Sequence, residues 1–202
     1  MELEFKPVVA GDIDRLRPFY GLRPNKTCDS VFLDSFLWKD YYHVQCAVSE
    51  GRAVLWLMEK DGQVSTAMPL CREEDLPYFF QQMVDYFSGV LHKPFYISLA
   101  DEEAVQCLNL DPALFEVEEQ VDLKDYLYSG EELRKLEGKK FVKKRNHLNG
   151  FKRTYEGRYE YRRLCCSDRH EVWQFMERWR QHKEEVGAME LSLDYEVAGI
   201  HD

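Results

Sequence analysis

The sequence predicts a mixed α/β (α+β) fold in which helices flank a largely antiparallel, twisted sheet. Short apolar stretches are separated by the turn sequences Glu50-Gly-Arg and Lys60-Asp-Gly-Gln, which are typical of β-hairpins. Over residues 74–91, apolar residues recur at every third or fourth position, as in an amphipathic helix. A composition with 45% hydrophobic and 14% aromatic residues indicates a globular protein.

The first part of the chain, residues 1–128, is expected to form one domain. Its strands are expected at residues 2–9, 43–48, 52–58, 64–70, 95–99, 115–119 and 121–128. Its helices are expected at residues 12–20, 31–40, 74–91 and 101–108. Because only short turns separate the three strands between residues 43 and 70, these strands are expected to form an antiparallel meander.

The second part, residues 129–202, is expected to begin with one long helix that runs to about Arg153. The hydroxyl of Ser129 can cap its first turn, and Glu132 lies three residues further on, as a capping box requires. A strand at residues 158–164 and helices at residues 169–186 and 193–202 are expected to follow. One strand with two helices cannot make a stable sheet domain alone. Either the strand at residues 158–164 joins the sheet of the first domain, or the chain stops partway through a second domain.

Charge is distributed unevenly along the sequence. The net charge of −10 argues against non-specific binding of the whole surface to nucleic acid or to an anionic membrane. Residues 134–163, however, contain 12 Lys or Arg and 3 acidic residues, a local charge of +9. This asymmetry predicts a localised site for an anionic partner on the helix expected at residues 133–153.

On a helical wheel, the cations of this helix fall into two groups. Lys139 and Lys143 lie on a polar face, whereas Lys140 and Lys144 lie within an apolar stripe. A lysine in such a stripe must extend to water, pair with a carboxylate such as that of Glu137, or face a ligand, because a buried unpaired charge is costly. The sequence leaves these alternatives open.

If the helix borders a cleft, its cations are suited to bind phosphate or carboxylate. Arg145 would then hold an oxyanion through two hydrogen bonds, while the lysines would act as point charges. The preceding tyrosines, Tyr126 and Tyr128, can stack on a base or line a pocket, or they can pack within a sheet. The candidate anion- or donor-binding residues are Lys139, Lys140, Lys143, Lys144, Arg145, Asn146, His147 and Asn149.

Several other kinds of site are not predicted. The string that begins at His170 carries Gln174 where a zinc protease has its second histidine, and neither a glycine-rich phosphate loop nor a GxSxG sequence is present. No metal site is expected. The six cysteines lack CxxC spacing and the N-terminus does not resemble a signal peptide, so reduced thiols in a cytoplasmic protein are expected, with structural roles for Cys165 and Cys166. No run of about 18 apolar residues predicts a transmembrane segment.

Residues 125–128 (Asp-Tyr-Leu-Tyr) and 136–151 (Leu-Glu-Gly-Lys-Lys-Phe-Val-Lys-Lys-Arg-Asn-His-Leu-Asn-Gly-Phe) resemble a bacterial family named for its likeness to the C-terminal domain of phosphatidylglycerol lysyltransferase. Phe5-Lys-Pro, Asp12-Ile-Asp and Ser35-Phe-Leu-Trp support the resemblance, which covers most of the chain. It implies a tandem pair of GNAT-type acyltransferase folds: a first GNAT-like domain at residues 1–128, then the basic helix and an incomplete second GNAT-like domain at residues 129–202.

The resemblance also implies a transferase activity, with aminoacyl-tRNA or acyl-CoA as the donor and tRNA or another phosphate-bearing molecule as the partner. A GNAT domain that binds CoA has a glycine-containing loop before its central helix, whereas this sequence has Met68-Pro-Leu-Cys-Arg-Glu-Glu-Asp there. These acids would repel a pyrophosphate at the helix N-terminus. The alternatives to an acyl- or aminoacyl-transferase are a non-catalytic module that binds an anionic ligand through the basic helix, and a purely structural role for that helix.

Overall fold

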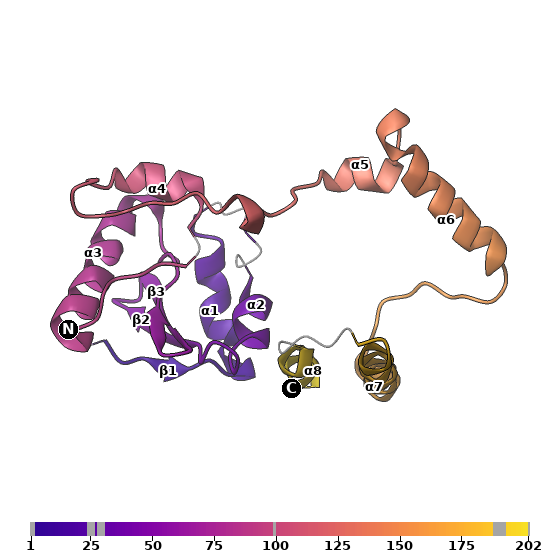
Figure 1. Ribbon diagram of the computed structural model, residues 1–202, viewed down its shortest axis with the longest axis horizontal. Coiled ribbons are helices and arrows are strands. Elements are labelled where there is room, and N and C mark those ends of the chain that lie inside the picture. Colours follow the sequence, from indigo (N-terminus) through magenta and orange to yellow (C-terminus); the bar gives the residue numbers. More distant parts are fainter. Residues whose placement is uncertain (1–2, 24–26, 28–30, 99, 188–192, 202) are drawn as a thin grey trace. The chain divides into compact units, whose positions relative to one another are not determined.

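The computed structural model describes residues 3–23, 27, 31–98, 100–187 and 193–201. The chain divides into two compact units (Figure 1). Unit 1 comprises Met1–Val121 and Arg178–Asp202, and unit 2 comprises Asp122–Glu177. Residues 178–202 thus group with the first part of the chain. The second GNAT-like domain expected at residues 129–202 stays a prediction.

Unit 1 contains a four-stranded antiparallel sheet in the order β1-β2-β3-β4. The expected meander is confirmed, with Cys46 opposite Trp56 in its central pair of strands. The turns contain Gly51 and Gly62 at φ of 68° and 80°, a backbone conformation that glycine adopts without steric cost. The strands are β1 (Lys6–Pro7), β2 (Gln45–Ser49), β3 (Ala53–Lys60) and β4 (Gln63–Ser65).

Helices cover both faces of this sheet (Figure 1), which confirms the mixed α/β fold class. Side chains alternate along β3, so that Leu55 packs with Phe79 of α3, whereas Trp56 packs with Leu16 of α1 and Phe36 of α2. The helices of unit 1 are α1 (Ile13–Tyr20), α2 (Phe32–Leu37), α3 (Leu76–Tyr86), α4 (Glu102–Leu108) and α8 (Leu193–His201), with short turns η1 (Ala10–Asp12), η2 (Glu73–Asp75) and η3 (Phe87–Leu91).

The strands expected at residues 95–99, 115–119, 121–128 and 158–164 are wrong, since the described residues of these segments form no strand. The apolar residues of two of these segments pack against α3 instead. The rings of Phe95 and Phe115 contact the ring of Phe80, with centroids 5.2 and 5.5 Å away. One isolated bridge, between Thr66 and Ile97, joins residues 95–98 to the sheet. Apolar residues in these segments therefore reflect packing of side chains and not a ladder of backbone hydrogen bonds.

Unit 2 is helical, and its expected long helix is broken. The helix stops at Lys135, and Leu136 and Gly138 both have positive φ in the bend that follows. Phe141, just after the bend, is buried, with 6% of its surface exposed. Glycine within a helical pattern permits such an interruption. The elements of the unit are α5 (Gly130–Lys135), η5 (Lys139–Phe141), α6 (Val142–Thr154) and η6 (Cys166–Asp168). At its two ends, η4 (Val121–Leu123) and α7 (Arg169–Glu185) each continue from one unit into the other.

One local motif occurs in both units. Val9 and Cys165 are extended residues that precede a 3-10 turn, and the last residue of each turn is an aspartate, Asp12 or Asp168. Each aspartate accepts the backbone N–H of the extended residue, at 3.0 Å in unit 1 and 2.8 Å in unit 2, and a helix follows directly. Each also accepts two hydrogen bonds from one arginine; the two arginines are Arg15 and Arg162.

In the described part of the chain, no helix combines the length and the apolar character that a membrane crossing requires.

Replacing Gly199 by alanine is expected to weaken the contact of α8 with α2. A Cβ at this position would lie 2.9 Å from the backbone oxygen of Leu37, closer than real Cβ contacts. Overpacking of this kind costs about 1–3 kcal/mol in the free energy of unfolding, which urea titration measures. Gly150→Ala in α6 is the matched control, because its Cβ would meet no atom within 4 Å. Equal losses in both variants would contradict the prediction.

Candidate anion-binding site

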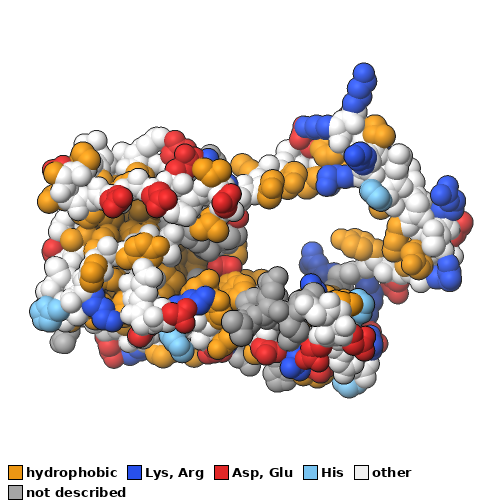
Figure 2. Space-filling view, viewed as in Figure 1, with side chains coloured by type: hydrophobic (Ala, Val, Ile, Leu, Met, Phe, Trp, Pro, Cys, Tyr) orange, Lys and Arg blue, Asp and Glu red, His pale blue; other side chains and the backbone are white. Residues whose placement is uncertain are grey.

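Lys and Arg side chains gather over α5 and α6 (Figure 2). Lys139 and Lys143 are exposed, as are Lys152 and Arg153 at the end of α6. Within the described part of the chain, none of these four cations has a carboxylate within ion-pair distance. Their charge is therefore available to an anion from outside the unit.

The polar residues of the candidate site are also exposed. Asn146, His147 and Asn149 lie on α6 and are exposed to solvent. On a helix with 3.6 residues per turn, Asn146 and His147 lie to either side of Lys143. Amide and imidazole groups at these positions can donate hydrogen bonds to an oxyanion that Lys143 attracts.

Lys140 is paired within the unit. Its ammonium lies 2.7 Å from the carboxylate of Glu132 in α5, whereas the sequence offered Glu137 as a possible partner. Glu132 consequently does not close a capping box, although its backbone N–H donates to the hydroxyl of Ser129 at 3.4 Å. Both partners are more than half exposed, at 62% and 51%, so this pair contributes at most about 1 kcal/mol to stability.

Lys144 lies beside an exposed pair of aromatic rings. Its ammonium is 6.0 Å from the ring centroid of Tyr128, which stacks on Tyr126 with centroids 6.4 Å apart and ring planes 22° apart. The expectation that these tyrosines pack within a sheet is wrong, because residues 124–129 form no strand and Tyr126 is 87% exposed. The two rings instead offer open aromatic faces next to a cation.

Arg145 binds the protein's own backbone. Its guanidinium donates to the carbonyl oxygens of Leu136 and Gly138, the second at 2.9 Å. These oxygens lie where the chain leaves α5 and have no partner within a helix, so Arg145 stabilises the bend between α5 and α6. These two hydrogen bonds leave fewer N–H groups of the guanidinium for the contact with an oxyanion that the sequence suggests.

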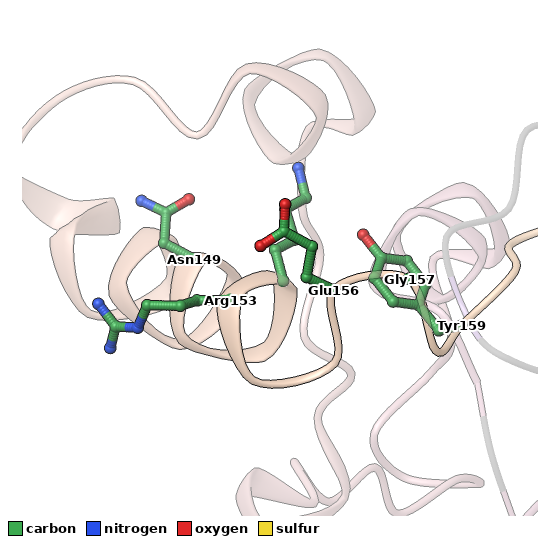
Figure 3. Close-up of a pocket in the computed structure, with 6 residues that line it drawn as sticks. Asn149, Arg153, Glu156, Gly157 and Tyr159 are labelled. Carbon is green, nitrogen blue, oxygen red and sulfur yellow. The ribbon is translucent and has the colours of Figure 1, made fainter.

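An open hollow of about 610 Å³ lies at the end of α6 (Figure 3). Asn149 was among the candidate residues, and its position on α6 brings it to the same hollow as Arg153. The other residues that line the hollow were not among the candidates predicted from the sequence, although Lys152 lies in the basic segment 134–163. The lining residues are Asn149, Lys152, Arg153, Glu156, Gly157 and Tyr159.

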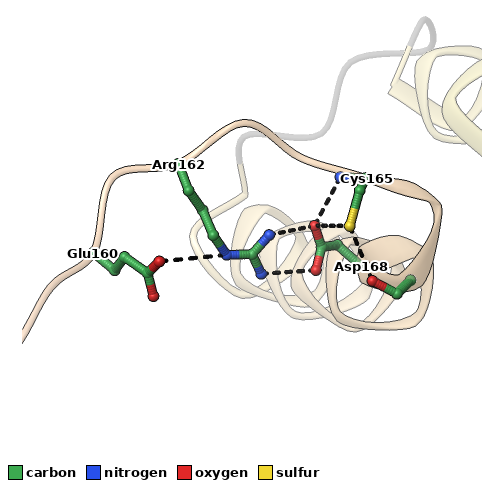
Figure 4. Close-up of polar contacts among 5 residues, drawn as sticks. Glu160, Arg162, Cys165 and Asp168 are labelled. Carbon is green, nitrogen blue, oxygen red and sulfur yellow. Dashed lines mark hydrogen bonds and ion pairs between the residues drawn. The ribbon is translucent and has the colours of Figure 1, made fainter.

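A polar cluster fixes the start of α7 (Figure 4). Arg162 donates two hydrogen bonds of 2.6 and 2.7 Å to Asp168, which also accepts from the backbone N–H and the thiol of Cys165. The bonds from Arg162 hold the pKa of the Asp168 carboxyl well below its usual range. Through these contacts Cys165 helps to fix the start of α7, which is a structural role. Separately, the ring of His170 forms a hydrogen bond of 2.9 Å with the side chain of Gln174.

The contribution of Asp168 to the start of α7 is expected to be constant from neutral pH to about pH 4 and to fall below it. A carboxyl with a lowered folded-state pKa stabilises the folded state above the unfolded pKa of about 3.9, and this contribution is lost as the pH falls through the folded pKa. Hydrogen exchange of the Cys165 amide measures it. Asp168→Asn should weaken the protection at pH 5 and remove its acid dependence; unchanged exchange would contradict the prediction.

The junction before α3 in unit 1 is acidic. Glu73 and Glu74 are exposed in the first turn, and Asp75 forms an ion pair with Arg52. Carboxylates at a helix N-terminus oppose the binding of a further anion there. Among the described residues, no group of three or more His, Cys, Asp or Glu side chains is placed to hold a metal ion.

These features define a mixed α/β protein with a basic, partly aromatic helical surface. The chain belongs to the family of the phosphatidylglycerol lysyltransferase C-terminal domain, whose family model matches residues 21–196. It is thus a lysyltransferase-like domain. A crystal structure of a conserved protein of unknown function from Bacteroides thetaiotaomicron VPI-5482 has the same fold, with a TM-score of 0.84 and 22% sequence identity over 99% of this chain and 67% of that chain. A search of curated proteins found no match.

Proposed function

We propose that this chain acts in acyl or aminoacyl transfer, with aminoacyl-tRNA as the donor, and that the surface of α5 and α6 binds the phosphates of the donor. Membership of a lysyltransferase-like family supports the reaction class. The observation that carries the binding role is the set of exposed cations without carboxylate partners among the described residues, namely Lys139, Lys143, Lys152 and Arg153.

The exposed aromatic rings beside Lys144 favour a nucleic-acid end over a simple anion. Bases of a single strand stack on exposed aromatic side chains while cations neutralise the adjacent phosphates. Tyr126 and Tyr128 are exposed by 87% and 56%, and the ammonium of Lys144 lies beside Tyr128. The single-stranded acceptor end of a tRNA combines these two chemical features. Holding it would position the aminoacyl ester, which is the main requirement for catalysis of transfer by proximity.

We also propose that residues 129–202 contain the beginning of a second GNAT-like domain. The repeated motif supports this view, because Cys165 and Asp168 make the same hydrogen bond before α7 that Val9 and Asp12 make before α1. In unit 1 this motif joins β1 to the first helix of the sheet domain. Acyl-CoA is the weaker candidate donor, since the acids before α3 oppose a pyrophosphate there.

Binding of tRNA to the chain over a salt series tests the proposal. Each phosphate contact contributes about −0.7 to −0.9 to the slope of log K against log salt concentration, so four cations predict a slope of about −3. A fluorescent tRNA and anisotropy titrations between low and high salt measure it. Affinity that does not change with salt concentration would contradict the proposal.

A non-catalytic module that binds an anion is the second candidate, and the acidic turn before α3 favours it. The two candidates differ in the fate of the aminoacyl ester. A transferase is expected to transfer or release the aminoacyl group of bound aminoacyl-tRNA faster than free aminoacyl-tRNA loses it. A module is expected to bind the same tRNA and leave its ester unchanged.

A further inference from the structure

Four aromatic rings of unit 1 form a corner near the end of β3. The rings of Tyr41 and Tyr42 are nearly perpendicular, with centroids 4.7 Å apart and an interplanar angle of 86°. Trp38 meets both tyrosines edge to face, at 5.5 and 6.2 Å. Tyr195 of α8 contacts Tyr41 at 5.1 Å. Perpendicular rings present two aromatic faces to one point, which is the arrangement found where proteins bind organic cations.

Backbone contacts hold these rings in place. The N–H of Tyr42 donates to the carbonyl of Trp38 at 3.0 Å, and the N–H of Glu59 donates to the carbonyl of Tyr42 at 2.8 Å. The second bond ties the ring-bearing segment to β3. Since α8 approaches α2 closely at Gly199, Tyr195 is also fixed relative to the corner. The corner is thus built into the fold and does not depend on a ligand for its shape.

The corner already contains a cation. The ammonium of Lys60 lies 3.9 Å from the ring centroid of Tyr41 and 5.5 Å from that of Tyr42, and it donates a hydrogen bond to the Tyr41 hydroxyl. That hydrogen bond raises the pKa of Lys60. Among the described residues, no carboxylate lies within ion-pair distance of this ammonium. Aromatic faces therefore take the place of a counterion.

We propose that this corner binds a small organic ammonium ion, and that Lys60 is its built-in occupant, which the ligand displaces. A lysine side chain has a flexible four-carbon stem, so its ammonium can leave for water while the rings stay in place. A quaternary ammonium is the best competitor, because it forms no hydrogen bonds with water and gains more from aromatic faces. A metal ion is disfavoured here, since aromatic rings offer it none of the oxygen or nitrogen ligands that it needs.

Choline is the probe for the test, and Lys60→Met removes the ammonium group that lies over Tyr41 and Tyr42. Lys60→Met should bind choline at least about tenfold more tightly than the wild-type chain, with an upfield NMR shift of the N-methyl protons from the aromatic rings. The neutral isostere 3,3-dimethylbutanol should bind far more weakly. Lys93→Met, at an exposed lysine elsewhere in unit 1, is the matched control and should leave choline binding unchanged.

A second measurement needs no variant. In the wild-type chain, saturating choline should move the ε-methylene resonances of Lys60 to the position of a solvated lysine, because the ammonium leaves the rings. Three results would overturn the proposal: Lys60→Met binds choline no better than the wild type, dimethylbutanol binds as tightly as choline, or Tyr41→Leu added to Lys60→Met leaves the affinity unchanged. Each result would leave Lys60 as an ordinary side chain resting on Tyr41.

Discussion

Replacing Lys143 and Arg153 together by glutamate is expected to lower the affinity of the chain for tRNA at least about tenfold at 0.1 M salt. Both side chains are exposed on α6, ten residues and therefore about 15 Å apart along its axis. Neither has a carboxylate partner among the described residues, so the substitutions break no internal ion pair. The loss of two phosphate contacts should also reduce the salt slope by about 1.5.

The control for this double variant changes the net charge by the same amount in unit 1. Lys6→Glu with Lys93→Glu replaces two exposed lysines there. If tRNA responds to the local surface of α6, this control should keep most of the affinity. If both double variants lose affinity equally, only the net charge of the chain matters, and the proposed role of α6 is wrong.

The elements that could be predicted from the sequence are those in which one face is strongly apolar. Residues 74–91 show helical spacing, and α3 with its last turn η3 ends at Leu91 as expected. The helix expected at residues 169–186 is α7 (Arg169–Glu185), and the stretch 101–108 is α4 with Asp101 as its cap. For the two longer helices the spacing of apolar residues alone predicts the helix, so no tertiary contact is needed for the prediction.

The break between α5 and α6 contradicts the single long helix that the spacing of apolar residues predicts. A helical wheel drawn from Leu133 assumes continuity, and Gly138 was given no weight as an interruption. Within α6 the prediction survives, since Lys144 still lies on the side of Leu148 and Phe151. Across the break it fails, and Lys140 reaches Glu132 of α5 instead of Glu137. A short glycine-containing bend can therefore change the partner of a charged residue without changing the helical content much.

The exposure of the candidate site was easier to predict than its internal contacts. A dense run of cations must lie largely in solvent, and Lys139 and Lys143 do. The use of Arg145 at two backbone carbonyls depends on the bend and has no signal in residue spacing. Similarly, the repeated motif has no clear signal in the sequence, because the segments Val9–Asp12 and Cys165–Asp168 share only the final aspartate. The role of the site in donor binding stays a prediction.

Arg23→Met is expected to lower the free energy of unfolding by about 3–5 kcal/mol, as the loss of one partner in a buried ion pair does. The side chains of Arg23 and Asp101 are each 6% exposed, and the guanidinium donates to both carboxylate oxygens at 2.9 and 3.0 Å. Seventy-eight residues separate the two partners in sequence, so no local pattern predicts the pair. Removing Arg23 leaves the Asp101 carboxylate with a hydrogen bond from the N–H of Ala104 at 2.9 Å.

Two comparisons separate this effect from that of an ordinary ion pair. Arg17→Met removes the ion pair of Arg17 with Asp14, in which the two side chains are 68% and 89% exposed. This substitution should lower the free energy of unfolding by less than about 1 kcal/mol. Asp101→Asn added to Arg23→Met should destabilise less than the sum of the single variants, because no uncompensated charge then stays buried. Urea titrations of the four variants measure these differences. Equal, small losses for Arg17→Met and Arg23→Met would mean that water reaches Asp101, and that the pair does not hold the segment after α1 against the start of α4.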